Sequence, residues 1–140
     1  EPLFPSLTKG DSSMRLDIDC VRDVLMAVEQ KGFGQSYTIS NLHDLLDYSS
    51  DQIEYTCLKL SEAGYLDITT VQMTQKTTPG IYSVNELTFQ GHEFLSNISS
   101  QKVFDKTKKI CQGLGSASLE VVAQVASNVL SSLINPKMFF

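Results

Sequence analysis

The feature that most constrains this chain is a pair of short, adjacent helical patterns followed at once by two strand-like segments. The first helical pattern has Ser40 as its predicted N-cap and carries Leu42, Leu45 and Leu46 along one edge. It ends near Tyr48, so a tight turn separates it from the next helix. Two helices joined in this way are typical of a helix-turn-helix.

The second helix of the pair is predicted to span residues 50–63. Ser49 and Gln52 form the Ser-x-x-Gln pattern of a capping box at its start. Gly64 follows as a residue that can adopt the left-handed conformation in which helices often end. The predicted core edge of this helix consists of Ile53, Cys57, Leu60 and Ala63.

Residues 66–73 and 81–84 are predicted to form a β-hairpin. The first segment is rich in Thr and Val, and Thr-Thr-Pro-Gly at residues 77–80 supplies the turn. A short β-prone triplet at residues 37–39 precedes the two helices. The side chains expected to face inward in the first strand are Leu66 and Ile68 and, after a break in phase at Thr70, Val71 and Met73.

Further helices are predicted on both sides of this unit. Residues 17–30 show an amphipathic pattern that Asp17 can cap. Another helix starts at Thr88, and two more follow over residues 102–112 and 119–134. The apolar members of the helix after Thr88 are Phe89, Phe94, Leu95 and Ile98.

This element order predicts an α+β, mainly helical fold: a winged helix-turn-helix with a β-hairpin wing and two extra C-terminal helices. The alternative is a general α+β domain whose hairpin does not pack beside the second helix of the pair. Residues 1–13 are expected to be a disordered arm or a remnant ahead of a native start. Residues 14–98 form the predicted winged-helix domain, and residues 99–140 a helical extension that packs on it or mediates dimerisation.

Three segments resemble a single family. They are MRLDIDCVRDVLMAVE (14–29), YTCLKLSEAGYL (55–66) and LTFQGHEFLSNI (87–98), of which Gly-His-Glu-Phe-Leu is the most distinctive part. They are similar to a family of uncharacterised bacterial and phage proteins classed as a domain of unknown function. The resemblance extends over residues 14–134 and implies a winged-helix-like fold, but it brings no established activity. Phe104 departs from the family, where a tryptophan is expected.

The charge of the chain weighs against nucleic acid as its partner. The formal net charge is −5, whereas nucleic-acid-binding proteins usually present a basic face to the phosphates. On the helix at residues 50–63, three carboxylates accompany one lysine on the edge opposite the core. A protein contact or an ordinary solvated face is therefore favoured over groove recognition. The candidate partner-binding residues on this edge are Asp51, Glu54, Tyr55, Leu58, Lys59 and Glu62.

Candidate nucleic-acid contacts are few. Lys76 lies in the predicted wing, and Lys102, Lys106 and Lys109 share one face of a predicted helix. These lysines could neutralise phosphates, but a solvated helix face is the preferred interpretation.

The last predicted helix is nearly uncharged, with Glu120 as its single ionisable side chain. It carries more apolar residues than one buried face needs, which favours a homodimer or a deeply buried helix. The candidate dimer interface comprises Val122, Val125, Val129, Leu130 and Leu133.

Candidate catalytic, cofactor-binding and metal-binding residues are not found. The chain has three cysteines without a C-x-x-C pair and two histidines, too few convergent ligands for a metal or a nucleophile pair. Buried free thiols are expected, and the absence of a long apolar run or signal-like start favours a cytoplasmic protein. The sequence predicts a non-catalytic regulatory module that acts through protein contacts, including its own dimer. A DNA-binding transcriptional regulator is the alternative.

Overall fold

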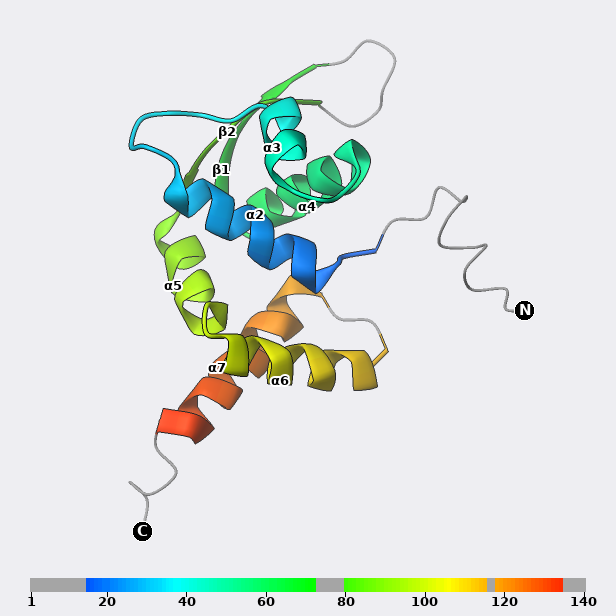
Figure 1. The fold of residues 1–140 in the computed structure, drawn as a ribbon, viewed down its shortest axis with the longest axis vertical. Coiled ribbons are helices and arrows are strands. Elements are labelled where there is room, and N and C mark those ends of the chain that lie inside the picture. Colours follow the sequence, from blue (N-terminus) through cyan, green and yellow to red (C-terminus); the bar gives the residue numbers. More distant parts are fainter. Residues whose placement is uncertain (1–14, 73–79, 116–117, 135–140) are drawn as a thin grey trace, which may run out of the picture.

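The structure is a computed structural model that describes residues 15–72, 80–115 and 118–134. Within these residues the chain is a mainly helical α+β protein with six helices and a two-stranded hairpin (Figure 1), which confirms the predicted class. The predicted arm, Met73, Lys76 and the start of the predicted hairpin turn lie outside the described residues. The elements are α2 (Ile18–Gln30), α3 (Ile39–Leu45), α4 (Ser50–Glu62), β1 (Leu66–Val71), β2 (Gly80–Leu87), α5 (Phe89–Ile98), α6 (Gln101–Gly113) and α7 (Leu119–Ile134).

Helix α2 runs through the middle of the molecule and packs on α4, α5 and β2 (Figure 1). Asp17 caps it, because its carboxylate accepts hydrogen bonds from the backbone of Asp19 and Cys20. The apolar stripe predicted from the sequence forms the centre of the core. Its buried members are Cys20, Val21, Val24, Leu25 and Val28, which pack with Leu42, Ile53, Cys57, Leu60 and Val84.

The hairpin is antiparallel, and its pairing shifts at the residue where the sequence pattern changes phase. Thr69 pairs with Ser83 and Thr70 with Ile81, so Tyr82 has no partner and forms a β-bulge. Val71 was predicted to face inward, and this is wrong: it is exposed, as is Tyr82. Past the bulge, the β2 side of the hairpin still contacts the core, since Gly80 is buried and Ile81 packs against it, whereas Val71 of β1 is left exposed.

The predicted strand at residues 37–39 is reduced to a single bridge. Tyr37 exchanges two backbone hydrogen bonds with Val84 of β2, of 2.9 and 2.7 Å. The chain then turns into α3, whose N-cap is Thr38, not the predicted Ser40. Thr38 and Asn41 form a reciprocal capping box, and this geometry places the helix start earlier than the apolar pattern indicated.

Helix α4 spans nearly the predicted residues, but its capping box is only half present. The Ser49 hydroxyl accepts a hydrogen bond from the Gln52 backbone, whereas the Gln52 amide donates to the Arg15 carbonyl instead of returning to the cap. Ala63, predicted at the core edge, is exposed because it is the C-cap. Thr56 is buried instead, with its hydroxyl donating to the Gln52 carbonyl.

The end of α4 is joined tightly to the start of α5, and we call Gly64, Tyr65, Thr88 and Gly91 the α4–α5 junction. Gly64 has φ +85°, as predicted for the residue that ends the helix. The Thr88 hydroxyl donates to the Gly64 carbonyl (2.6 Å) and accepts from the Gly91 backbone (3.0 Å). Tyr65 stacks on Phe94, with ring centroids 4.9 Å apart.

The family-like segments 55–66 and 87–98 meet at this junction. A Cβ on Gly91 would lie 2.0 Å from the Tyr65 carbonyl oxygen, so any other residue there would push the two elements apart. The Gly-x-x-Phe spacing of the distinctive segment therefore has a structural cause: glycine permits the close approach, and Phe94 fills the space beside Tyr65.

Helices α6 and α7 lie at the end of the molecule opposite the hairpin, and both pack on α5 or on each other (Figure 1). Arg22 of α2 links that helix to the end of α5 and to α6. Its guanidinium donates to the carbonyls of Ile98 and Ser99 and lies 4.6 Å from the centre of the Phe104 ring. Phe104, which stands where the family resemblance led us to expect tryptophan, is buried under this cation.

Candidate functional site

The solvent-facing edge of α4, which we call the α4 face, is the surface that the sequence singled out. Its residues lie at the surface as predicted: Asp51 and Glu62 are exposed, and Glu54, Tyr55, Leu58 and Lys59 are half-buried. None of the six belongs to the buried core.

The charge of the α4 face is negative, because it carries three carboxylates and one lysine, and that lysine is paired within the face. The Lys59 ammonium lies 3.1 Å from a Glu62 carboxylate oxygen and 5.5 Å from the centre of the Tyr55 ring. The ion pair joins Lys59 to Glu62, and no ion pair among the described residues involves Asp51 or Glu54. Arg15, which the sequence analysis did not select, lies at the start of α4, since its carbonyl accepts from Gln52.

One face of the hairpin carries a hydrogen-bond network centred on Asn85. The Asn85 amide donates to Asp67 and Thr69, both at 3.1 Å, and its oxygen accepts from Ser36 and Ser83. Asn85 therefore has both donors and both lone pairs in use. What remains on this face is largely acceptor capacity, from the Asp67 carboxylate and the serine hydroxyls, and acceptors disfavour a phosphate backbone.

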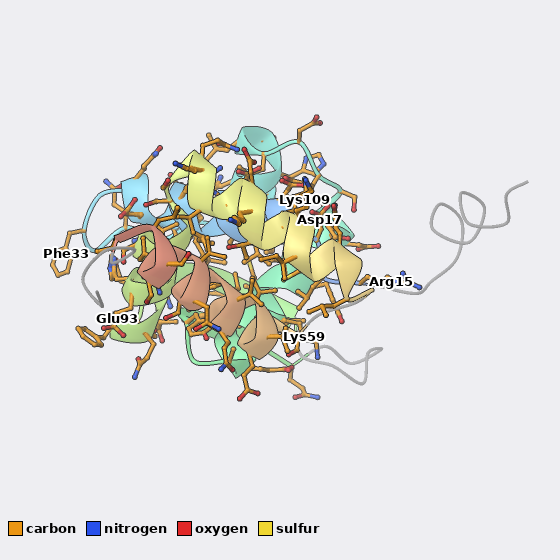
Figure 2. All side chains as sticks on the ribbon, turned by 90° about the horizontal axis from the view of Figure 1, so that it is seen from below. Arg15, Asp17, Phe33, Lys59, Glu93 and Lys109 are labelled. Carbon is orange, nitrogen blue, oxygen red and sulfur yellow. The ribbon has the colours of Figure 1, made fainter. Side chains whose placement is uncertain are left out.

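The predicted basic cluster does not adjoin the α4 face. Lys102, Lys106 and Lys109 are exposed on α6, which lies at the end of the molecule opposite the hairpin (Figure 1), and Figure 2 shows Lys109 apart from Lys59 of α4. Lys108, between them, is committed to an ion pair of 2.6 Å with Asp19, and this hydrogen bond raises the pKa of Lys108. The exposed lysines of α6 therefore do not form part of the α4 face. Lys76 lies outside the described residues.

The candidate dimer residues of α7 divide into two groups. Val122 and Val129 are buried within the single chain, so they hold α7 on α5 and α6 and are not available at the surface. Val125, Leu130 and Leu133 are half-buried. The periodicity of the helix could not separate these groups, since both lie within the same apolar pattern.

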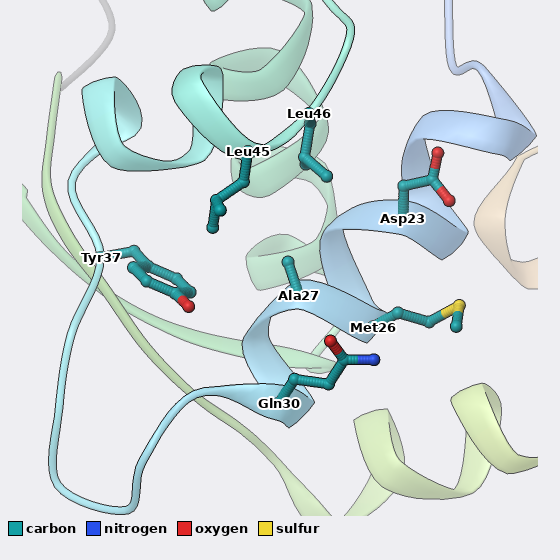
Figure 3. A pocket seen from close by; sticks show the side chains of 7 residues that line it. All are labelled: Asp23, Met26, Ala27, Gln30, Tyr37, Leu45 and Leu46. Carbon is teal, nitrogen blue, oxygen red and sulfur yellow. The ribbon is translucent and has the colours of Figure 1, made fainter.

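A pocket of about 370 Å³ opens between α2 and α3, and no pattern in the sequence predicted it (Figure 3). Most of its lining residues are apolar or aromatic, but polar atoms form nearly half of its exposed lining. Asp23 lies at its edge, where its carboxylate accepts a 2.8 Å hydrogen bond from the Tyr48 hydroxyl. Burial, followed by this bond to Asp23, raises the pKa of Tyr48. The lining residues are Asp23, Met26, Ala27, Gln30, Tyr37, Leu45 and Leu46.

All three cysteines are free and buried, as predicted. Burial raises the pKa of Cys20 to about 11 and that of Cys57 to about 12, so both stay as thiols near neutral pH. Among the described residues, no three His, Cys, Asp or Glu side chains gather as metal ligands would. The described helices include none with the length and apolar character needed to cross a bilayer.

The fold and the α4 face define a small, mainly helical α+β protein with an acidic helix edge next to a hairpin. A family model described as hypothetical protein (DUF2513) matches residues 15–118, and the chain belongs to this family. The match ends before α7, although the resemblance seen in the sequence extended over that helix. A search of curated proteins found no match to the chain, and neither did a search of solved structures.

Proposed function

We propose that the chain is a winged-helix protein that works without catalysis, as a regulatory module whose α4 face binds another protein. The order of elements supports the winged helix: α2, the Tyr37 bridge, α3, α4, β1 and β2 follow one another as in that fold. In this proposal α4 occupies the recognition-helix position and the hairpin is the wing. The protein is of bacterial or phage origin and resides in the cytoplasm.

One observation carries the choice of a protein over DNA. The only lysine of the α4 face is paired with Glu62 at 3.1 Å, so a phosphate approaching this helix would meet carboxylates. A like-charge contact of this kind costs on the order of 1 kcal/mol even at the dielectric constant of water. A partner protein that supplies arginine or lysine would instead gain from the same charges, with Tyr55 and Leu58 as apolar contacts beside them.

The test compares charge reversal on two helices. The double variant Glu54→Lys/Glu62→Lys inverts the α4 face, and Glu29→Lys/Glu93→Lys makes the same charge change at exposed acids of α2 and α5. Both are used as baits in a lysate of the source cell beside the wild type. A protein retained by the wild type and the control, but lost with the α4 variant, supports the proposal. Equal retention by all three contradicts it.

A DNA-binding transcriptional regulator is the second candidate, and the exposed lysines of α6 favour it. A fluorescence titration with random duplex at low salt distinguishes the two. Salt-sensitive binding that disappears in Lys102→Glu/Lys106→Glu/Lys109→Glu would favour the regulator, since each phosphate contact adds to the salt dependence. No binding at low salt is the result expected from the α4 face.

A further inference from the structure

The most exposed large apolar side chain among the described residues is that of Phe33, at 96%. It lies in the loop between α2 and Tyr37, and Figure 2 shows its ring pointing away from the rest of the molecule. This exposure is sustained by a fixed backbone. The Gln35 amide donates to the Gly32 carbonyl, and Gly34 takes φ +81°, which turns the chain sharply around Phe33.

Glu86 of β2 fixes this loop on both sides of Phe33. One of its carboxylate oxygens accepts from the Gly34 backbone at 3.1 Å and lies 2.9 Å from the Lys31 ammonium. The Lys31 side chain is 1% exposed, so the ion pair is shielded from water on its cationic side. The loop backbone on both sides of Phe33 is therefore held in place, while its ring extends into solvent.

Both ends of this loop lie at the pocket between α2 and α3. Gln30 precedes the loop, Tyr37 follows it, and both line the pocket (Figure 3). The other walls include Met26, Ala27 and Leu45, and Leu45 is 59% exposed. The loop that presents the ring thus leaves from one wall of the hollow and returns to another.

We propose that a second copy of this chain inserts its Phe33 into this pocket, while the first copy does the same in return. A two-fold dimer places the same surface patch of both subunits in contact, so a projection next to a hollow can be satisfied twice by one symmetry axis. At about 370 Å³ the pocket has room for a phenyl ring.

The charges of this surface fit a second copy. The chain carries a net charge of −5, so two copies repel each other over most of their surfaces. Residues 32–36 contain no ionisable side chain, and Lys31 is neutralised by Glu86. The Asp23 carboxylate at the pocket edge accepts a hydrogen bond from Tyr48, and the other residues that line the pocket carry no charge. Contact here brings few like charges together.

The buried area predicts a weak dimer. Each aromatic ring buries about 150–250 Å², so the two rings and the walls that receive them together remain below the roughly 1,200 Å² of a standard stable interface. Dissociation constants in the micromolar range or weaker are expected, with Phe33 as the residue on which the affinity depends most. Neither Phe33 nor the pocket belongs to the α4 face, so the dimer can fail without affecting the proposed function.

Sedimentation equilibrium from micromolar to millimolar concentration measures the dimer. The wild type should dimerise, and Phe33→Ser should weaken dimerisation at least about 30-fold, the loss expected for a hot-spot side chain. Phe89→Ser removes another exposed ring and should leave the dimer intact. Leu45→Asp should weaken it from the pocket side. Unchanged circular dichroism and denaturation midpoints verify that each variant folds.

Three outcomes would overturn the proposal. The wild type could stay monomeric at all concentrations. This outcome also covers a pocket that binds an apolar dye while the chain remains a monomer. Phe33→Ser could dimerise as well as the wild type. Dimerisation could be lost only in Val125→Asp/Leu130→Asp, which would place the interface on α7. As a direct check, a mixed sample of labelled and unlabelled chains should give intermolecular nuclear Overhauser effects between the Phe33 ring and the Ala27 methyl group.

Discussion

The α4–α5 junction and the Phe33 loop use the same structural device for opposite purposes. In each, a side chain at or just after the end of β2 forms hydrogen bonds with the backbone of glycines: Thr88 with Gly64 and Gly91, and Glu86 with Gly34. At the junction the neighbouring aromatic residue, Tyr65, is stacked on Phe94. In the loop the aromatic residue is left in water. A fixed glycine turn can therefore either close a core or present a side chain.

The largest difference between the two regions should appear when their phenylalanines are truncated. Phe94 is 3% exposed and Phe33 is 96% exposed. Phe94→Ala should lower the free energy of unfolding by about 3–5 kcal/mol, because it leaves a cavity beside Tyr65. Phe33→Ala should change it by less than about 0.5 kcal/mol. Urea denaturation of both variants measures the contrast, and similar losses would show that the Phe33 ring is buried in the monomer.

Gly91→Ala tests the close approach at the junction. The new Cβ would meet the Tyr65 carbonyl oxygen at 2.0 Å, and relieving that overlap requires α5 to move away from the end of α4. A loss of about 3 kcal/mol in the free energy of unfolding is expected. Gly113→Ala is the control, since no atom lies within 4 Å of its added Cβ. Its stability should be equal or slightly higher, and parallel losses in both variants would exclude the steric explanation.

Thr88→Val removes the hydroxyl that joins α5 to Gly64 while keeping the shape of the side chain. The variant loses the N-cap of α5 and leaves the Gly64 carbonyl without its 2.6 Å partner. The expected loss is about 1–2 kcal/mol, as for other caps. Thermal or urea unfolding gives the value. Thr88→Ser retains the hydroxyl and should recover most of the stability, whereas a Ser variant as unstable as Val would count against the hydrogen bond.

The smallest expected effect concerns the charge of Glu86 in the loop. The Lys31 ammonium, followed by the Gly34 amide, lowers the pKa of Glu86 below its ordinary value of 4.5. Because the folded pKa is the lower one, ionised Glu86 stabilises the fold above about pH 4.5, and this contribution is lost as the pH falls through the folded pKa. Glu86→Gln should therefore be less stable than the wild type at pH 7, with the gap closing in acid. A gap independent of pH would rule out a role for the charge.

Prediction from the sequence succeeded where the cause is local. Asp17, Ser49, Gly64 and Thr88 each act on backbone groups within a few residues, and the helix boundaries they set were correct or nearly so. It failed at Ser40 although the cause there is also local, because Thr38 forms a reciprocal box with Asn41 and sets an earlier helix start. It failed at Val71 because the pairing register with β2, and not the alternation within β1, decides which side chains are covered.

The surface properties also divide into those set by residues close together in the sequence and those set by residues far apart. The acidity of the α4 face could be predicted, since helical spacing places Asp51, Glu54 and Glu62 on one edge whatever surrounds the helix. The engagement of Arg22 and Lys108 could not be predicted, because their partners lie more than seventy residues away in the sequence. For the same reason the burial of Val122 and Val129 in the chain itself could not be separated from exposure in a dimer.

By itself, the sequence determined most of the helices and the hairpin, the mainly helical α+β class and the sign of the charge on α4, because these depend on residues close together in the chain. Only the tertiary structure decided that Gly91 meets the Tyr65 carbonyl, that the α6 lysines lie away from α4, and that the loop carrying Phe33 leaves from one wall of a pocket and returns to another. These relations join segments far apart in the sequence, and packing of the whole core fixes their positions.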